Sequence, residues 1–412
     1  MPDIIVAGTG IHPGQLPPPH AAAVQRADIL VAGAGLLDHF SHHPAEKWEI
    51  RAPLDTLIRQ IDQASHTRQV VVLASGNPLF HGIGTPLVSA LGIHRLQILA
   101  NTSVVSEACA RTGLPVDRTP VISLHHTGPS GFLYLLTTTD AAILLTSPRH
   151  DPAWIGGQMR DAGMHRFRCC VMEQLGHTAE QIRWMTVAEM ADTQAASPNI
   201  IALVADTETP VPWQPISMGM PPNAFFHENS LITKPEVRVT ALARLHLSAG
   251  QTLWDLGAGS GSISIEAAPF IKKGQIFAVE KNAHRIENIR RNIKKFGAFN
   301  VMPVHATLPE GLAELPDPDR IFIGGGGKQL PDILLSAINR LPAGGVLVIT
   351  TVRMESLFAA KHLLHHHGIP FELVQLQVSA ARPLCGDLHF HAQNPVWILS
   401  AVLPSSHTRG SL

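Results

Sequence analysis

The sequence predicts an α/β protein of two domains, the second with a Rossmann-like fold. Its 412 residues exceed the about 100–200 residues of a usual single domain. Short apolar runs alternate with helix-like segments along both halves, which is typical of sheets covered by helices. Residues 208–222 contain five prolines. Because proline fixes φ and removes an amide donor, we expect a linker there.

The first half contains eight strand-like runs, each short, apolar and bounded by turn residues. Helix-like segments such as 54–65 and 152–162 separate several of them. This alternation favours a mainly parallel sheet. The expected strands are 4–7, 29–32, 70–74, 96–99, 121–124, 141–146, 169–173 and 200–204.

The second half begins at about Asn223, with a helix expected over 237–245. Seven strand-like runs follow, and no helix-like segment separates the last two. A parallel sheet that ends in an antiparallel pair is therefore expected, and the tail 404–412 should be disordered. The expected strands are 252–256, 275–280, 301–305, 320–323, 346–351, 372–378 and 396–402.

Composition argues against several classes of protein. The net charge is −1 and no basic stripe is interleaved with aromatic residues, so no nucleic-acid partner is expected. The four cysteines form no C-x-x-C pair, which predicts reduced thiols in a cytoplasmic protein. We expect no signal peptide, because the chain opens directly on a strand-like run. No apolar stretch approaches the about 18 residues that a membrane span needs.

The strongest motif is DLGAGSG at 255–261, which follows the strand 252–256 and precedes a helix. Alternate glycines let a ligand approach the backbone at the carboxyl ends of the strands. Glu280 ends the next strand and can accept the ribose hydroxyls of an adenosine. Because the spacing is G-x-G-x-G, S-adenosylmethionine is favoured over a dinucleotide. A glycine-rich turn without a ligand is the structural alternative.

Two other patterns suggest ligands less well. The run GGGGK at 324–328 is not a P-loop, because Phe322 and Gln329 stand where Gly and Ser/Thr belong. Because this glycine run follows the strand 320–323, we expect it to lie at the entrance of the substrate-binding site. No metal site is expected from the histidine run 365–367, whose side chains would point in three directions. His389 and His391 would share a strand face, but no Cys or carboxylate accompanies them.

A weaker pair of turns occurs in the first half. Gly8 and Gly10 follow the strand 4–7, and SGNP at 75–78 follows the strand 70–74. Together they suggest a ligand cleft at the strand ends. Either turn alone is a common connection between a strand and a helix, so a purely structural role stays open.

Residues 223–403 resemble the C-terminal module of the decarboxylating precorrin-6Y methyltransferase family. The resemblance rests on LITKPEVR at 231–238, LWDLGAGSGSISIE at 253–266, FIGG at 322–325 and NPV at 394–396. It implies a class I methyltransferase fold. The cofactor-binding residues that it implies, with the motif's leading aspartate, are Thr233, Asp255, Gly257, Gly259, Gly261, Glu280 and Ala306.

Residues 1–207 resemble the tetrapyrrole methylase family, a class III fold of two α/β subdomains with the cofactor between them. The resemblance rests on the two turns above, on Thr102-Ser103 and on VISLH at 121–125. The sequence departs from the family at Asn77, where Asp is usual, at Ala100-Asn101, at Gly35 and in the loop 11–14. The implied cofactor contacts are Gly8, Gly10, Gly76, Asn77, Phe80, Ser103 and Val104.

The resemblance implies a reaction of cobalamin biosynthesis. Precorrin-6B and two S-adenosylmethionine, one per domain, would give precorrin-8, two S-adenosylhomocysteine and carbon dioxide. The first domain would methylate C-5, and the second would methylate C-15 and decarboxylate the ring C acetate. Because the substrate carries many carboxylates, cations should line its mouth. The candidates are Lys234, Lys328, Arg353 and Arg382.

Three alternatives stay open. The substrate could carry cobalt, as in the anaerobic route. The first half could be a recognition module beside a single-site methyltransferase. The chain could also bind S-adenosylmethionine without catalysing a reaction. The family further suggests a homo-oligomer, for which C2 symmetry is the commonest arrangement.

Overall fold

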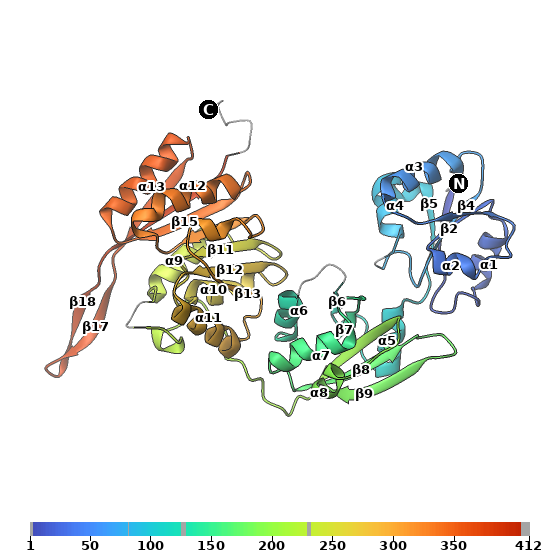
Figure 1. Cartoon of the computed structure of the whole chain (residues 1–412), viewed down its shortest axis with the longest axis horizontal. Helices are drawn as coiled ribbons and strands as arrows, with labels where there is room; N and C mark the ends of the chain where they lie inside the picture. The colour runs from blue at the N-terminus through green and yellow to red at the C-terminus, as the bar shows by residue number, and fades with distance from the viewer. Residues whose placement is uncertain (1–2, 81, 125–128, 229–231, 405–412) are drawn as a thin grey trace. The chain divides into compact units, whose positions relative to one another are not determined.

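The computed structural model describes residues 3–80, 82–124, 129–228 and 232–404 (Figure 1). The chain folds as two compact units. The first comprises Met1–His126 and Asp140–Thr209, and the second comprises Thr127–Thr139 and Pro210–Leu412. Helix α6 (Pro129–Leu136) therefore groups with the second unit, although its neighbours in the sequence belong to the first.

The first unit contains a five-stranded parallel sheet in the order β3-β2-β4-β1-β5. Its central strand β4 is buried along its whole length, as expected of a strand that is covered on both faces. The strands are β1 (Ile4–Gly8), β2 (Ile29–Ala32), β3 (Glu46–Glu49), β4 (Val70–Ala74) and β5 (Leu96–Leu99). The helices are α1 (Pro18–Gln25), α2 (Ala34–Asp38), α3 (Leu54–Ser65) and α4 (Gly84–Leu91), with a 3-10 turn at Ile93–Arg95.

A second five-stranded sheet completes the first unit, in the order β6-β7-β10-β8-β9. Only β6 and β7 pair in parallel, so the prediction of a mainly parallel sheet is wrong for this half of the unit. Apolar runs predict that strands are buried but carry no information on their direction. The strands are β6 (Val121–Ser123), β7 (Ala141–Leu145), β8 (Phe167–Glu173), β9 (Gln181–Thr186) and β10 (Asn199–Ala205). The helices are α5 (Val104–Thr112), α7 (Pro152–Asp161) and α8 (Val187–Ala191).

The second unit is built on a seven-stranded sheet in the order β13-β12-β11-β14-β15-β19-β16. The first five strands are parallel, and β19 is antiparallel to both of its neighbours, as the sequence predicts. The strands are β11 (Thr252–Leu256), β12 (Gln275–Glu280), β13 (Val301–His305), β14 (Arg320–Ile323), β15 (Val346–Thr351), β16 (Phe371–Leu376) and β19 (Val396–Val402).

Helices cover this sheet, and one hairpin stands apart from it. The helices are α9 (Pro235–Leu245), α10 (Ser262–Ala267), α11 (Ala283–Phe296), α12 (Leu330–Arg340) and α13 (Met354–His366). Short 3-10 turns occur at Pro222–Ala224, Ala268–Phe270, Glu310–Leu312 and Gly327–Gln329. The hairpin of β17 (Ser379–Leu384) and β18 (Asp387–Ala392) forms a separate two-stranded sheet. The sequence predicted a strand at His389 and His391 but neither β17 nor its pairing with β18. Within the described residues, no helix has the length and apolar character needed to cross a membrane.

The proline-rich segment after β10 is tied to the second unit. The backbone N–H of Gln214 donates to the carbonyl of Lys295 at 2.9 Å, and the Trp213 ring meets the edge of Phe299. Further along, the N–H groups of Gly219 and Met220 both donate to the Glu266 carboxylate at 2.9 Å. The segment therefore lies against the helices of the second unit from residue 213 onward.

Candidate active site

The glycine loop of the second unit leaves the carboxyl end of β11 and is fixed by the neighbouring strand. The N–H groups of Gly257 and Ala258 both donate to the carbonyl of Val279 at 3.0 Å. Gly257, Gly259 and Gly261 all have φ between +59° and +78°, a left-handed region that favours glycine. The alternate glycines therefore allow a turn that other residues would adopt only with strain.

Glu280 ends β12 and faces this loop. One carboxylate oxygen accepts the N–H of Gly259 at 3.0 Å, and the other accepts the N–H of Asn282 at 3.0 Å. The carbonyl of Glu280 also accepts the N–H of Ala306, which brings the end of β13 to the same place. An ionised carboxylate has about four acceptor positions, so two are left for hydroxyl donors such as those of a ribose.

Open space lies in front of two of the three glycines. A Cβ built on Gly259 would meet no atom within 4 Å, and one on Gly257 would only touch the Gly325 backbone, at 3.5 Å. A Cβ on Gly261 would lie 3.2 Å from the side chain of Ile289 on α11. Gly257 and Gly259 can therefore admit a ligand close to the backbone, whereas Gly261 lets α11 pack on the loop.

Asp255 is fully buried behind the loop. Its Oδ2 accepts the hydroxyl of Ser264 at 2.5 Å, which ties β11 to the first turn of α10. Among the described residues, neither Asp255 Oδ1 nor the hydroxyl of Ser260 has a hydrogen-bond partner. Burial raises the pKa of Asp255 to about 7, against the smaller lowering effect of Ser264.

Thr233 is positioned by a buried ion pair. Arg238 on α9 and Glu266 on α10 are both fully buried, and their Nε and Oε1 atoms lie 2.9 Å apart. The remaining guanidinium nitrogens of Arg238 donate to the carbonyls of Thr233 and Met220. Arg238 therefore connects the segment before α9 to α10, the helix that follows the glycine loop.

The side chain of Asn292 on α11 makes a second set of hydrogen bonds that connects parts of the site. Its side-chain amide donates to the carbonyls of Ser260 and Phe226, at 2.9 and 3.0 Å, and its Oδ1 accepts the N–H of Phe226 at 2.8 Å. Asn292 is fully buried. It therefore joins the glycine loop to the segment that precedes Thr233.

The site predicted in the first unit is more closely packed. Gly10 and Gly76 pair through two backbone hydrogen bonds, which join the turns after β1 and β4. The side chain of Asn101 donates to the carbonyl of Gly8 at 3.1 Å and accepts the N–H of Thr102 at 2.8 Å. A Cβ on Gly8 would overlap the carbonyl of Gly76, and one on Gly10 would lie 3.1 Å from Asn101. These two glycines therefore serve close packing of the protein itself.

The remaining predicted residues of the first unit lie around this junction. The Oδ1 of Asn77 accepts the N–H of Leu79 at 3.0 Å, and the hydroxyl of Ser103 caps α5 by accepting the N–H of Ser106 at 3.0 Å. A Cβ on Gly76 would lie 3.3 Å from the Cα of Ser103. Phe80 and Val104 pack against the apolar core of the second sheet. The structure thus brings the predicted residues of both sheets to one place.

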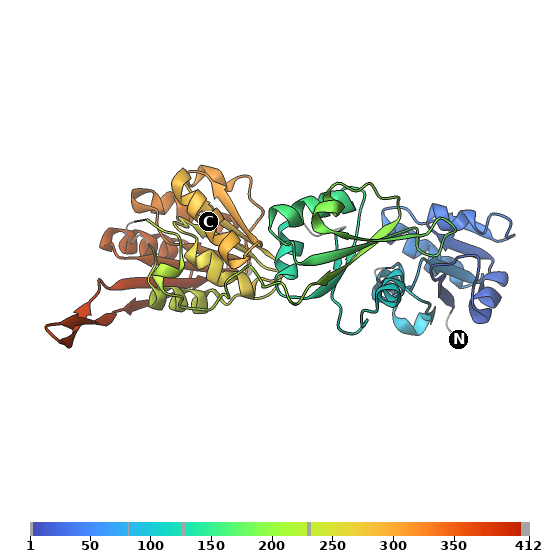
Figure 2. The ribbon, with the colours of Figure 1, turned by 90° about the horizontal axis from the view of Figure 1, so that it is seen from below.

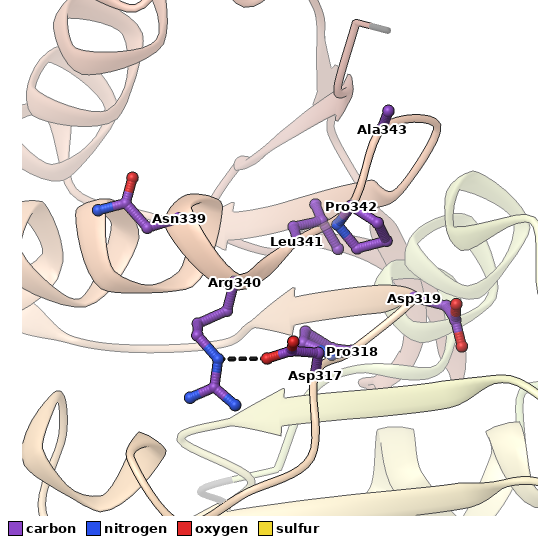
Figure 3. A pocket seen from close by; sticks show the side chains of 8 residues that line it. All are labelled: Asp317, Pro318, Asp319, Asn339, Arg340, Leu341, Pro342 and Ala343. Atoms are coloured by element: carbon purple, nitrogen blue, oxygen red, sulfur yellow. Dashed lines mark hydrogen bonds and ion pairs between the residues drawn. The ribbon is translucent and has the colours of Figure 1, made fainter. Parts of the chain in front are cut away.

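Two hollows need to be distinguished from these loops. One of about 750 Å³ lies at the carboxyl ends of β2 and β4 and is lined by Gly33, Gly35, Ser75 and Ile83, with His39 and His177. Its size suits a bulky ligand. Another of about 390 Å³ lies beside Asp319 and Ala343, which precede β14 and β15 (Figure 3). It is at the amino ends of the strands, away from the glycine loop, and Asp317 and Arg340 in it are paired with each other.

The chain matches two family models. One, described as tetrapyrrole (corrin/porphyrin) methylases, matches residues 3–191, and the other, a precorrin methyltransferase domain, matches residues 224–402. Over 355 residues the chain is 33% identical to a precorrin-6Y C(5,15)-methyltransferase (decarboxylating) of Mycobacterium tuberculosis, covering 85% of this chain and 87% of that protein. The chain belongs to the precorrin-6Y C(5,15)-methyltransferase family.

Two further relatives each match a little under half of this chain. A cobalt-precorrin-6B C(15)-methyltransferase (decarboxylating) of Salmonella typhi is 34% identical over 183 residues, covering 44% of this chain and 94% of that protein. A solved precorrin-6Y C5,15-methyltransferase structure from Geobacter metallireducens is 41% identical, covers 45% of this chain and 96% of that one, and has a TM-score of 0.43.

The four candidate cations lie on separate segments of the second unit. Lys328 follows β14 and Arg353 follows β15, so both lie in loops at the carboxyl edge of the sheet. Lys234 immediately precedes α9, next to Thr233, and Arg382 lies in the hairpin. Lys328, Arg353 and Arg382 are exposed, and among the described residues Arg353 forms one loose ion pair, with Glu355 at 3.7 Å.

Sequence reasoning missed several residues that shape these sites. Arg238, Glu266 and Asn292 hold the second site together, and Asn101 does so in the first. Arg238 and Glu266 stand within matched family segments, but nothing in the sequence shows that the two side chains meet. Asn101 was noted as a departure from the family, and its packing role depends on the return of β5 beside β1.

Proposed function

We propose that this protein methylates precorrin-6B at C-5 and C-15, with S-adenosylmethionine as methyl donor, and decarboxylates the ring C acetate to give precorrin-8. The observation that carries the proposal is the likeness to a C(5,15)-methyltransferase over 85% of the chain. The open loop at Gly257 and Gly259, faced by Glu280, supports it independently.

The residues of the second unit fit S-adenosylmethionine. We assign Glu280 to the ribose hydroxyls, the backbone at Gly257 and Gly259 to the amino-acid end, and Thr233 and Ala306 to the flanks of the site. S-adenosylmethionine supplies, when bound, a methyl group on a positively charged sulfur that leaves readily. Asp255 keeps the loop in place from behind through Ser264.

Positioning can account for this chemistry without a strong base. The meso carbon of a reduced tetrapyrrole is enamine-like and is itself the nucleophile. The protein must hold the two reactants in line and exclude water, which can lower the barrier by about 7–11 kcal/mol. The conjugated macrocycle can take up the electron pair that carbon dioxide leaves behind. Lys234, Lys328, Arg353 and Arg382 would bind the substrate carboxylates.

We assign C-5 methylation to residues 1–207 and C-15 methylation with decarboxylation to residues 223–403. The Salmonella typhi relative supports this division, since a protein matched by 44% of this chain carries the C(15) and decarboxylating name alone. In the first unit, one S-adenosylmethionine would bind at the junction of Gly76, Asn77 and Ser103. The hollow of about 750 Å³ beside Ser75 would receive the tetrapyrrole.

The same relative favours a second candidate substrate, cobalt-precorrin-6B, with the same two reactions. The experiment is therefore run with both substrates. The full chain is incubated with S-adenosylmethionine and either precorrin-6B or cobalt-precorrin-6B, and the product mass is followed. We expect a gain of two methyl groups with loss of carbon dioxide.

Gly259→Arg should fill the space in front of the loop and block the second site, leaving one methyl transfer and no carbon dioxide release. Gly368→Arg is the matched control, because Gly368 also has a positive φ (+63°) and open space around its Cβ position. It precedes β16 and so lies at the opposite edge of the sheet. If wild type binds S-adenosylmethionine but changes the mass of neither substrate, the proposed function is wrong.

A further inference from the structure

The hollow of about 750 Å³ in the first unit has a mainly apolar lining. Its apolar side chains are those of Leu36, Ile50, Leu54, Leu73 and Ile83. Among the described residues that line it, none is Lys, Arg, Asp or Glu, and the ionisable ones are His39 and His177. Apolar walls fit the faces of a macrocycle, while carboxylates at its rim would find two imidazoles.

His39 directly follows α2 and is exposed. Its backbone is still helical, with φ −65° and ψ −21°, so positions 35 and 39 lie one turn apart on the same face. Gly35 also lines the hollow, and a Cβ built on it would meet no atom within 4 Å. This face of α2 is therefore open at Gly35 and carries an imidazole at His39.

His177 comes from the other sheet of the first unit, in the loop that joins the neighbouring strands β8 and β9 (Figures 1 and 2). The N–H of Gly176 donates to the Glu180 carboxylate at 2.8 Å. The N–H of His177 donates to the carbonyl of Gln174 at 2.9 Å. Glu180 also pairs with Arg111 of α5, at 3.4 Å. The loop therefore holds the backbone of His177 in a defined place, while its side chain is exposed.

This loop packs on the loop that follows β1. A Cβ built on Gly176 would lie 2.6 Å from the carbonyl oxygen of Ile11 and 3.0 Å from its side chain. Pro13, two residues further along, lines the hollow together with His177. The close contact of Gly176 with Ile11 thus brings an imidazole from one sheet to a hollow at the strand ends of the other.

Other histidines of the first unit have structural partners. The buried His20 hydrogen-bonds through Nε2 to the carbonyl of Ala100 at 3.1 Å, and His150 does so through Nδ1 to that of Leu124 at 2.8 Å. Within the described part of the chain, the imidazoles of His39 and His177 form no such bond. Every imidazole carries at least one N–H, so each of these two can donate to a ligand.

We propose that His39 and His177 bind carboxylates of the tetrapyrrole in this hollow and thereby orient it for methylation at C-5. The inference rests on the proposed function, from which it takes the substrate. Because the two side chains come from different sheets, they fix the macrocycle at two points. They hold the substrate equally before and during methyl transfer, so they contribute to its binding and not to the rate of the bound complex.

The test uses Gly259→Arg as the reference protein, which should transfer the C-5 methyl group alone. In this background, His39→Leu and His177→Leu should each raise the KM for the tetrapyrrole at least about 10-fold at nearly constant kcat, because each removes a hydrogen bond to a charged group. The affinity for S-adenosylmethionine should not change. The matched control is His66→Leu, an exposed position after α3 at the amino end of β4, which should keep the reference KM.

A rescue variant separates substrate binding from a structural role of His39. Gly35→Lys places a cation on the same face of α2, in open space. Added to His39→Leu, it should bring the KM back toward the reference value, because the ammonium can bind the same carboxylate. Gly35→Ala in the same background adds a side chain without charge and should leave the KM raised.

Two results would overturn the inference alone. The reference protein could methylate the tetrapyrrole while both histidine variants keep its KM. The variants could also lose affinity for S-adenosylmethionine instead, because the hollow would then hold the cofactor. A reference protein that transfers no methyl group to either substrate would contradict the proposed function as well, and that result is recognised without any histidine variant.

Discussion

The two glycine-rich turns of this protein look alike in sequence and differ in what surrounds them. At Gly257 and Gly259 the space in front of the backbone is open. At Gly8 and Gly10 that space is filled by the Gly76 carbonyl, Pro78 and Asn101. The same residue type therefore leaves open space in front of the backbone in one unit and permits close packing of the chain in the other.

This difference shows that a position can require glycine for two physical reasons. A left-handed φ, as at Gly259, makes any side chain strained even where there is room for it. An overlap, as at Gly8, excludes a side chain even though the backbone is ordinary. A left-handed φ does not by itself leave space for a ligand, because Gly10 and Gly261 also have positive φ and face Asn101 and Ile289, so glycine spacing alone does not establish a binding site.

The largest expected effect is a loss of stability when the buried Arg238–Glu266 pair beside the open glycine loop is broken. Arg238→Met removes one partner of a buried pair and leaves Glu266 uncompensated, which should cost about 3–5 kcal/mol of the stability of the second unit. Hydrogen exchange of peptides from this unit measures the loss. The control Arg244→Met breaks the exposed pair with Glu372 and should cost only about 0–1 kcal/mol. Equal effects would mean that the buried pair has no special role.

The next prediction compares a closely packed glycine of the first unit, Gly8, with one in open space, Gly14. Gly8→Ala should cost about 1–3 kcal/mol, because the new Cβ would overlap the Gly76 carbonyl and lie 2.9 Å from Pro78. Gly14→Ala in the following loop meets no atom within 4 Å and should change stability by less than about 0.5 kcal/mol. Hydrogen exchange of β1 and β4 compares them. If Gly8→Ala is as stable as Gly14→Ala, the close packing described at this turn is not what requires the glycine.

Taken per pH unit, the smallest expected effect concerns Asp255, whose pKa burial raises to about 7. Between about pH 4 and pH 7 the folded carboxyl keeps a proton that the unfolded one has lost. Its contribution to stability therefore falls as pH rises through this window, by up to about 1.4 kcal/mol per pH unit, and levels off above it. Asp255→Asn should lack this slope in cofactor-free unfolding measured from pH 4 to 8. Parallel curves for the two proteins would show that Asp255 is ionised throughout.

The sequence predicted strands best where apolar residues dominate the run. The seven strands of the main sheet in the second unit are confirmed, because each is an apolar run closed by turn residues. β9 and β3 were missed because their residues are mostly polar or exposed. In the hairpin, the strand at His389 and His391 was predicted, but β17 was missed because its few apolar residues form no continuous run and none of them is buried.

The sequence by itself determined the family, the two α/β units, the loop that ends β11 and the acidic residue that faces it. Local chemistry is sufficient for these, because glycine spacing and strand periodicity act over a few residues. Only the tertiary structure decided that Arg238 meets Glu266, that Asn101 fills the space at Gly10, and that the second sheet of the first unit is mostly antiparallel. Each of these depends on segments far apart in the chain packing together, and no short motif encodes which distant side chain will arrive.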